Sequence, residues 1–253
     1  MKNFIEKYDN VLPSIICNRL IRIAKENPDL STPGSTVATR HLGLEETQKV
    51  KKTLDWDIKD KIDFKTKILI RNALLKCLPK YFKENIYAHQ NHPDFVSVIK
   101  EKEVELDDFT LLRKCIFSQY IMDQRQLFLK KYTDNDYFHW HTDNGGFGSI
   151  TSSNRALVCM FYLNDVKKGG TTDFLHQNVS LKPTKGSLVI FPANWMYIHR
   201  GTPPIDSEKW IMNFWLIKRN HFTMRDLLLH KSRNKDFLNI ENYLKKNNDY
   251  LIS

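Results

Sequence analysis

The sequence predicts an α+β fold in which helices flank a central β-sandwich or jelly roll. Apolar residues recur at helical spacing before about residue 115, whereas β-forming residues alternate with polar ones from about 115 to 220. After residue 221 the pattern is again helical, and it is basic. Since no repeat or low-complexity linker interrupts the 253 residues, we expect one domain: 1–114 as mainly helical support, 115–220 as a jelly-roll core and 221–253 as a helical tail.

Two helices are expected in the N-terminal part. Residues 14–26 place their apolar side chains on one helical face, and Ser14 is a candidate N-cap. Residues 63–83 show the same spacing over a longer stretch. Residues 30–43 read as a loop, and residues 85–108 follow no regular pattern.

Seven short strands are expected in the central part, separated by Gly-, Asn- and Pro-containing turns. They are 117–122, 126–132, 155–163, 172–175, 179–182, 187–191 and 209–217. Many short strands at such spacing are typical of a sandwich or jelly roll.

The composition limits the cellular context and the partners. A net charge of +10 allows an acidic partner such as nucleic acid, although the lysines are spread over many segments, as solvated helix faces would be. The four cysteines form no C-x-x-C pair, so we expect buried thiols. We see no signal peptide and no stretch of about 18 apolar residues, and therefore expect a cytoplasmic protein without a membrane partner.

The most informative pattern is His141-x-Asp143 followed by His199. Two imidazoles and one carboxylate can hold a non-heme Fe(II) on one face and leave the other positions open. Residues i and i+2 of a strand share a face, and His199 follows a predicted strand, so the three could meet. The spacing alone is weakly specific, because H-x-D occurs by chance in many chains, and His139 offers a second histidine two residues earlier. Zinc hydrolysis is disfavoured, since the H-E-x-x-H motif is absent.

Further motifs surround this pattern between residues 126 and 216. They are YTDNDYFHWHTD (132–143), RALVCMFYLNDVKKGGTTDF (155–174), KPTKGSLVIF (182–191), HRGTPP (199–204) and the pair KW (209–210). Together they resemble the catalytic core of the 2-oxoglutarate/Fe(II) oxygenases, specifically the prolyl 4-hydroxylase-like branch. Asn135 stands where that family has glycine, and Phe138 where it has a second tyrosine. The N-terminal stretch YDNVLPSIICNRLI is similar to the branch's opening strand and helix.

The resemblance implies a double-stranded β-helix (jelly-roll) core with flanking N-terminal and C-terminal helices, and it implies site residues. His141, Asp143 and His199 would be the catalytic Fe(II) ligands, while Tyr132, Tyr162, Lys209 and Trp215 would bind or surround the co-substrate. Lys209 would pair with the distal carboxylate of 2-oxoglutarate, because a charge-assisted bond in a dry site is strong. Dioxygen is the further co-substrate, and ascorbate is a candidate addition.

The implied reaction couples decarboxylation of 2-oxoglutarate, giving succinate and CO2, to hydroxylation of a C–H bond. We favour a prolyl or other residue of a protein or peptide as the target. A nucleic acid, a free amino acid or another small molecule, and a catalytically inactive binding module stay open as alternatives. One of the loops at 30–43, 85–108 and 144–154 is expected to act as a lid.

Overall fold

The computed structural model describes residues 2–36, 39, 42–85, 116, 120–122, 127–144 and 150–218. The chain divides into two compact units, residues 1–218 and 219–253. The predicted helical tail lies outside the described residues, as does nearly all of the predicted irregular segment 85–108.

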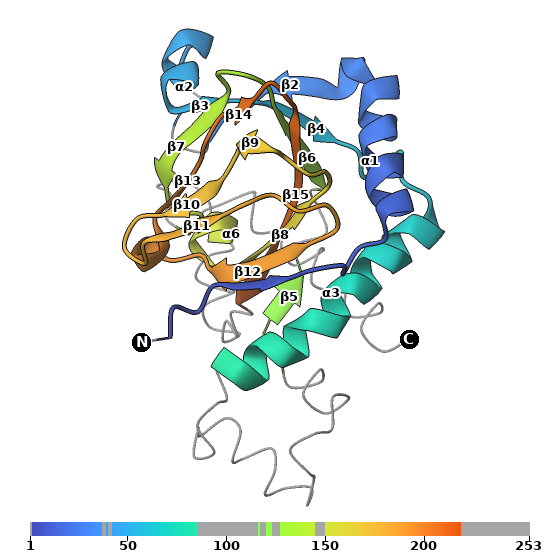
Figure 1. Ribbon diagram of the computed structural model, residues 1–253, viewed down its shortest axis with the longest axis vertical. Coiled ribbons are helices and arrows are strands. Elements are labelled where there is room, and N and C mark those ends of the chain that lie inside the picture. The colour runs from blue at the N-terminus through green and yellow to red at the C-terminus, as the bar shows by residue number, and fades with distance from the viewer. Residues whose placement is uncertain are drawn as a thin grey trace, which may run out of the picture. The chain divides into compact units, whose positions relative to one another are not determined.

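Two antiparallel sheets form the centre of this unit, and Figure 1 shows them as the two layers of a sandwich. The larger sheet runs β1 (Glu6–Tyr8), β12 (Leu188–Pro192), β8 (Arg155–Tyr162), β15 (Lys209–Lys218), β6 (Phe128–Tyr132), β4 (Leu54–Asp57) and β2 (Ser31–Pro33), and β5 (Tyr120–Met122) also pairs with β15. The smaller sheet runs β11 (Val179–Leu181), β10 (Thr172–Phe174), β13 (His199–Gly201), β7 (Tyr137–His141) and β3 (Lys51–Lys52). A ribbon of β14 (Pro204–Ile205) and β9 (Lys168–Gly169) is separate.

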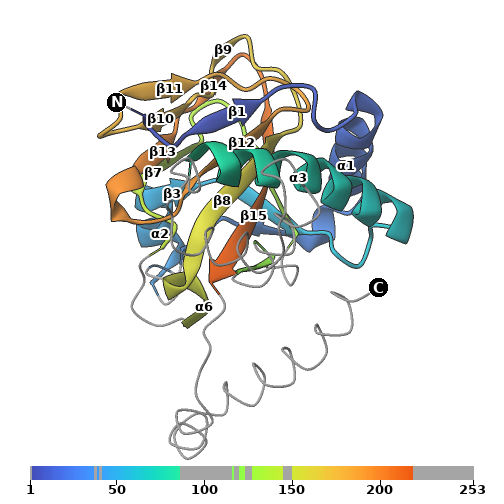
Figure 2. The same cartoon turned by 90° about the horizontal axis from the view of Figure 1, so that it is seen from below.

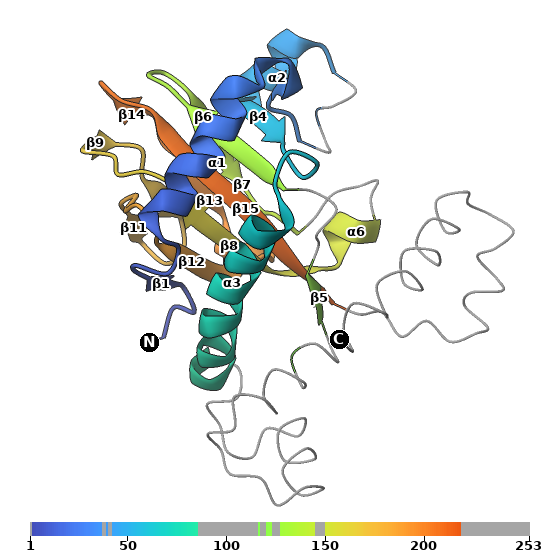
Figure 3. The same ribbon diagram turned by 90° about the vertical axis from the view of Figure 1, so that its right-hand side faces the viewer.

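Helices cover the outer face of the larger sheet. Figures 2 and 3 show α1 (Ser14–Glu26) and α3 (Phe64–Asn85) against this face. Two shorter helices, α2 (Leu44–Val50) and α6 (Ile150–Ser153), lie elsewhere in the unit. Helix α1 begins where predicted, but Ser14 does not cap it. The N-cap is Pro13, whose carbonyl accepts from the backbone of Ile16 and Cys17, so Ser14 is already the first helical residue.

Strand β15 divides the core into two apolar layers. Its residues Trp210, Met212 and Phe214 pack with α1 and α3, whereas Ile211 and Trp215 face the interior between the sheets. Each such fully buried side chain stabilises the fold by roughly 1.5–3 kcal/mol. The second layer surrounds the predicted site, so the same strand serves both stability and the site.

The α+β prediction is confirmed, and all seven predicted strands are present within the described residues. The predicted loop 30–43 is wrong in part, because β2 pairs with β4 there. The alternation of apolar and polar residues also did not predict several other strands, which are short, with two to five residues each: β1, β3, β4, β7, β9, β13 and β14. None of the described helices has both the length and the apolar character needed to cross a membrane.

The thiols behave as the cysteine pattern predicts. Cys17, Cys77 and Cys159 are free and buried, while Cys115 lies outside the described residues. Burial raises the pKa of both Cys17 and Cys77 to about 11, so these two stay protonated at neutral pH. They act as small core side chains.

Candidate metal and co-substrate centre

A β-bulge in β7 determines which histidine reaches the interior. His199 pairs with His141 across β13 and β7, as expected for neighbouring strands, but Gly201 pairs with Phe138. Strand β7 thus uses one more residue than β13 over this interval. Phe138 and His141 therefore both turn inward, whereas the competing His139 is exposed.

Asp143 reaches the site by a different route from the one predicted. Strand β7 ends at His141, so the expected i, i+2 relation within a strand does not apply. A bend follows, and two hydrogen bonds to the Ala193 carbonyl fix it. The Thr142 hydroxyl and the Asn144 backbone N–H each donate over 2.8 Å. This tether holds the intervening Asp143 in place after the strand has ended.

The three side chains converge on one point. Donor atoms of His141, Asp143 and His199 all lie within 4.8 Å of one another. The Nε2 atom of His199 is 3.5 Å from Oδ2 of Asp143. Each histidine Nδ1 contacts a backbone carbonyl, at 2.7 Å for His141 to His139 and 3.1 Å for His199 to Tyr197. Since a carbonyl only accepts, Nδ1 carries the proton and Nε2 keeps its lone pair for a ligand.

The protonation states also suit a cation. Burial and the nearby His199 lower the pKa of His141 well below its usual value, and burial lowers that of His199, so both rings are neutral. Burial would raise the pKa of Asp143, but His199, His141 and Arg155 outweigh it and hold the carboxyl ionised. Oδ2 of Asp143 is buried without a hydrogen-bond partner. A negatively charged oxygen in this state needs a cation, and the donor set fits a divalent metal ion.

Aromatic rings enclose the two histidines. The Phe138 ring stacks on His141, with centroids 3.4 Å apart and planes at 14°. Phe191 and Phe174 flank the His199 ring at 4.9 Å and 5.6 Å. These rings hold the imidazoles in place and keep water from their sides.

Lys209 is buried at the start of β15, with only 1% of its surface exposed. Its ammonium donates to the Thr171 carbonyl over 3.3 Å and lies 4.8 Å from the centre of the Tyr132 ring. Among the described residues no carboxylate lies within ion-pair distance of it, and burial lowers its pKa to about 7. A buried ammonium with so few partners is a receptor for an anion.

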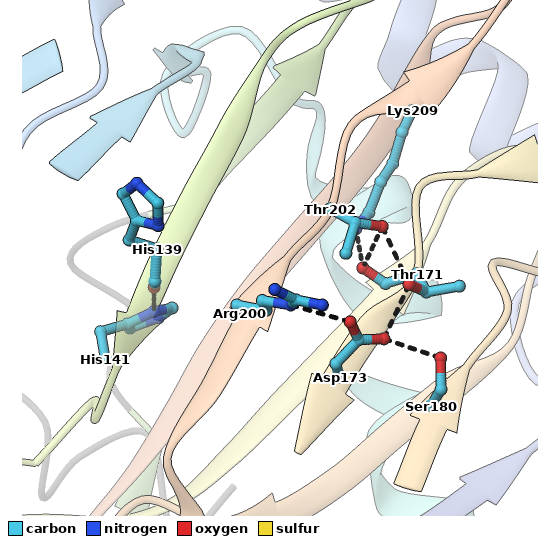
Figure 4. Close-up of polar contacts among 8 residues, drawn as sticks. All are labelled: His139, His141, Thr171, Asp173, Ser180, Arg200, Thr202 and Lys209. Carbon is cyan, nitrogen blue, oxygen red and sulfur yellow. Dashed lines mark hydrogen bonds and ion pairs between the residues drawn. The ribbon is translucent and has the colours of Figure 1, made fainter. Parts of the chain in front are cut away.

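A polar network fixes the strands beside Lys209 (Figure 4). The Thr171 hydroxyl donates to Asp173 over 2.7 Å and contacts the Thr202 hydroxyl at 2.8 Å. Arg200 pairs with the same Asp173 carboxylate at 2.9 Å. Arg200 already neutralises Asp173, so this carboxylate leaves Lys209 available.

The predicted aromatic residues lie around the same interior. Tyr132 is the register partner of Lys209 and is buried. The Tyr162 hydroxyl donates to Thr172 over 2.7 Å, and its ring centre is 5.9 Å from the Lys209 ammonium. Trp215 is buried with its indole N–H unpaired, and the Arg155 guanidinium stacks 3.7 Å above its ring. The structure thus brings all seven predicted site residues to one interior.

The sequence also contained interior polar residues that the prediction missed. They are Lys130 on β6, Arg155 on β8 and Asn213 on β15, whose Oδ1 is buried without a hydrogen-bond partner. The alternation along a strand could have found two of them. Lys130 is two residues from Tyr132, and Asn213 is two residues from Trp215.

Comparison with known proteins identifies this arrangement. Residues 127–217 match the family model of the 2OG-Fe(II) oxygenase superfamily. Over 80 residues the chain is 32% identical to the chicken (Gallus gallus) prolyl 4-hydroxylase subunit alpha-1, which covers 29% of this chain and 16% of that subunit. Residues 127–217 therefore form a segment of the 2OG-Fe(II) oxygenase type that is similar to the prolyl 4-hydroxylases. The match to the family model covers all seven predicted site residues.

Two further comparisons agree with this assignment. A putative prolyl 4-hydroxylase of Acanthamoeba polyphaga mimivirus is 32% identical over 104 residues, which is 35% of this chain and 43% of the relative. The solved prolyl hydroxylase of Trichoplax adhaerens, in complex with a hypoxia inducible factor peptide, superimposes with a TM-score of 0.54 at 14% identity, covering 85% of this chain and 84% of that one. This likeness shows the shared fold, and the jelly-roll prediction is confirmed. The chain spans less than half the length of both sequence relatives.

Proposed function

We propose that this chain is an Fe(II)- and 2-oxoglutarate-dependent dioxygenase that hydroxylates a prolyl or other residue in a protein or peptide. One observation carries the proposal. Two neutral imidazoles and the ionised Asp143 carboxylate, with donor atoms within 4.8 Å of one another, share an interior with the buried ammonium of Lys209, which has no carboxylate partner among the described residues. A metal ion would be held by the three donor atoms, and a carboxylate of an acidic co-substrate would pair with the Lys209 ammonium.

The metal ligands would be His141, Asp143 and His199, each as the structure orients it. Bound Fe(II) would supply the activation of dioxygen that drives decarboxylation and C–H hydroxylation. The chain's own contribution is to keep both imidazoles deprotonated at Nε2 and to hold the Asp143 carboxylate ionised.

The co-substrate end of the site would be built by Lys209 and the two tyrosines. The Lys209 ammonium would receive the distal carboxylate of 2-oxoglutarate, because a charge-assisted bond is strong where water is excluded. Burial raises the pKa of Tyr132 and Tyr162 far above neutrality, so both remain phenols; the Tyr132 hydroxyl can donate to that anion, while the Tyr162 hydroxyl donates to Thr172. The Trp215 indole N–H has no hydrogen-bond partner among the described residues and can donate inside the interior.

A protein or peptide target is supported by the proteins that this chain resembles. The animal and viral relatives are prolyl 4-hydroxylases by name, and the Trichoplax neighbour was solved with a peptide. The nucleic-acid alternative has no support beyond the net charge of +10. We therefore infer hydroxylation of a residue within a peptide chain.

A succinate-release assay tests the proposal. The chain would be given Fe(II), 2-oxoglutarate and oxygen with a panel of prolyl peptides, free proline and single-stranded oligonucleotides, with and without ascorbate. We expect succinate release to rise with at least one prolyl peptide, together with a 16 Da increase in its mass. Stimulation only by oligonucleotides or only by free proline would replace the proposed substrate class. No metal binding and no turnover with any addition would leave a binding module.

A further inference from the structure

Lys130 is a second buried cation next to the candidate metal site. It lies in the middle of β6 and only 6% of its surface is exposed. Within the described part of the chain, its ammonium makes neither a hydrogen bond nor an ion pair. The ammonium lies 5.8 Å from the centre of the Trp215 ring. A buried charge without acceptors destabilises a fold, so its retention calls for a ligand.

The carboxylates nearest to Lys130 are already engaged. Asp55 is its register partner on β4, yet Asp55 accepts from Lys51 at 2.5 Å and from Thr53 at 2.8 Å. Asp143 is directed toward His199 in the candidate metal site. The surroundings even disfavour the charge, since burial and the neighbouring Lys51 lower the pKa of Lys130 to about 8. At neutral pH the group is still mostly an ammonium ion that lacks an anion.

The position of Lys130 is set by the pairing of β6 with β15. Lys130 faces the same side of β6 as Tyr132, which pairs with Lys209, while Lys130 itself pairs with Ile211. The backbone positions of Lys130 and Lys209 are therefore about 7 Å apart, measured along the strand direction. The charge of Lys130 acts on Lys209 and on all three candidate metal ligands. Lys130 is thus close to both parts of the site.

Two unpaired ammonium ions in one interior match a ligand with two carboxylates. 2-Oxoglutarate has one at each end of a five-carbon chain, a length comparable to the separation of the two lysines along the strands. We infer that Lys130 binds the carboxylate at the keto-acid end of the co-substrate, opposite the end received by Lys209. This inference rests on the proposed function. It makes Lys130 a positioning residue that orients the keto acid toward the metal site.

Direct binding of two keto acids tests this assignment. We would titrate 2-oxoglutarate and 2-oxopentanoate, which lacks the distal carboxylate, into the full chain loaded with Mn(II) under calorimetry. Both acids share the keto-acid end. Lys130→Met should therefore weaken both by a similar factor of about tenfold or more. Lys209→Met should weaken only 2-oxoglutarate and so remove the preference for the dicarboxylate.

The neighbouring lysine provides the matched control. Lys131 is on the opposite side of β6 and pairs with Glu208 at 2.7 Å, so Lys131→Met should leave both affinities unchanged. Lys130→Arg retains the charge and should keep most of the affinity. Thermal unfolding of each variant separates ligand effects from folding. Lys130→Met removes an unpaired buried charge and should unfold no earlier than the parent chain.

The outcomes distinguish this inference from the proposed function. If the parent chain binds 2-oxoglutarate and Lys130→Met binds both keto acids equally well, the assignment of Lys130 is wrong while the proposed function stands. A change confined to the affinity for a peptide would likewise overturn it and move Lys130 to the primary substrate. If the parent chain with Mn(II) binds neither keto acid, the proposed function fails and this inference fails with it.

Discussion

Gly201 lies directly against Tyr132, where the two sheets approach each other beside the candidate site. A Cβ atom added at Gly201 would stand 3.2 Å from the Tyr132 hydroxyl oxygen and 3.2 Å from its ring edge. Gly201 is on β13 two residues after His199, and Tyr132 is the register partner of Lys209. This single contact therefore connects the strand of a candidate metal ligand to the receptor for the co-substrate.

Gly201→Ala should weaken 2-oxoglutarate binding several-fold while the chain still folds. To accommodate the added methyl group, the Tyr132 ring would have to shift by a few tenths of an ångström, and this buried ring has little room to move. Calorimetric titration of 2-oxoglutarate, together with circular dichroism, would measure both effects. Gly43→Ala is the control, because a Cβ there meets no atom within 4 Å. Equal affinities for the parent chain and Gly201→Ala would show that Tyr132 does not need this close approach.

His141→Ala should abolish metal binding, whereas His139→Ala should preserve it. The β-bulge turns His141 inward and leaves His139 exposed, although both belong to β7. The expected readout is the rise in melting temperature on adding Mn(II) or Fe(II) without oxygen, which a specifically bound ligand produces. The parent chain and His139→Ala should show the rise, and His141→Ala should not. Loss of the rise in His139→Ala alone would reverse the assignment of the two histidines.

The sequence predicted the seven site residues because their signals are local. The motif around His141 and Asp143, the later His199 and the pair Lys209-Trp210 can all be read along the chain. The path of the chain between them could not be read in this way. A single inserted residue makes the β7 bulge, and the Ala193 carbonyl that fixes the bend is far away in sequence. Such a contact exists only after folding.

The missed elements share a physical cause. Strands β3, β9 and β14 have two residues each, which is too short for any alternation to appear. Lys130 was missed because a lysine within an alternating pattern is expected to face solvent. Residues 130 and 131 are both lysines, and only the pairing of β6 between β4 and β15 decides which one is buried. Tertiary context thus overrides the composition at this position.

Lys209→Met should raise stability at neutral pH while it removes the selectivity for a dicarboxylate. Burial lowers the pKa of Lys209 from 10.5 to about 7 in the folded chain. Between pH 7 and 10.5 the unfolded chain therefore binds more protons, so the stability of the parent chain rises with pH across this range. The destabilisation of the folded chain by the buried Lys209 ammonium is fully present below pH 7. At pH 6.5 the variant should melt at least about 2 °C higher, and the difference should shrink toward pH 10.

The same titration predicts the pH dependence of co-substrate binding in the parent chain. Only the ammonium form of Lys209 can pair with a carboxylate, so the affinity for 2-oxoglutarate should fall as pH rises above about 7. Calorimetry at pH 6.5 and pH 8.5 in two buffers of different ionisation enthalpy would reveal proton uptake on binding. A pH-independent affinity without proton uptake would mean that Lys209 is already charged across this range.

Glu208→Gln should destabilise the chain at neutral pH, and the effect should vanish in acid. Glu208 joins three elements, with Lys25 of α1 at 3.0 Å, Lys131 of β6 at 2.7 Å and the Trp210 indole N–H at 2.9 Å. Partial burial opposes ionisation, but these donors outweigh it and lower the pKa of Glu208 from 4.5 to about 2. The stabilisation is therefore fully present above pH 4.5 and is lost as the pH falls toward 2.

We expect a loss of about 1 kcal/mol at pH 7, because the carboxylate is 36% exposed and solvent screens its ion pairs. Urea unfolding of both chains at pH 7, 4 and 2.5 would measure it. The difference in unfolding free energy should decrease at each step, since fewer unfolded chains keep the carboxylate ionised. Lys25→Met breaks the ion pair to α1, removes the Lys25 ammonium from above the Trp210 ring, and should reproduce part of the loss. A difference that stays constant from pH 7 to 2.5 would assign the effect to packing of the side chain, independent of its charge.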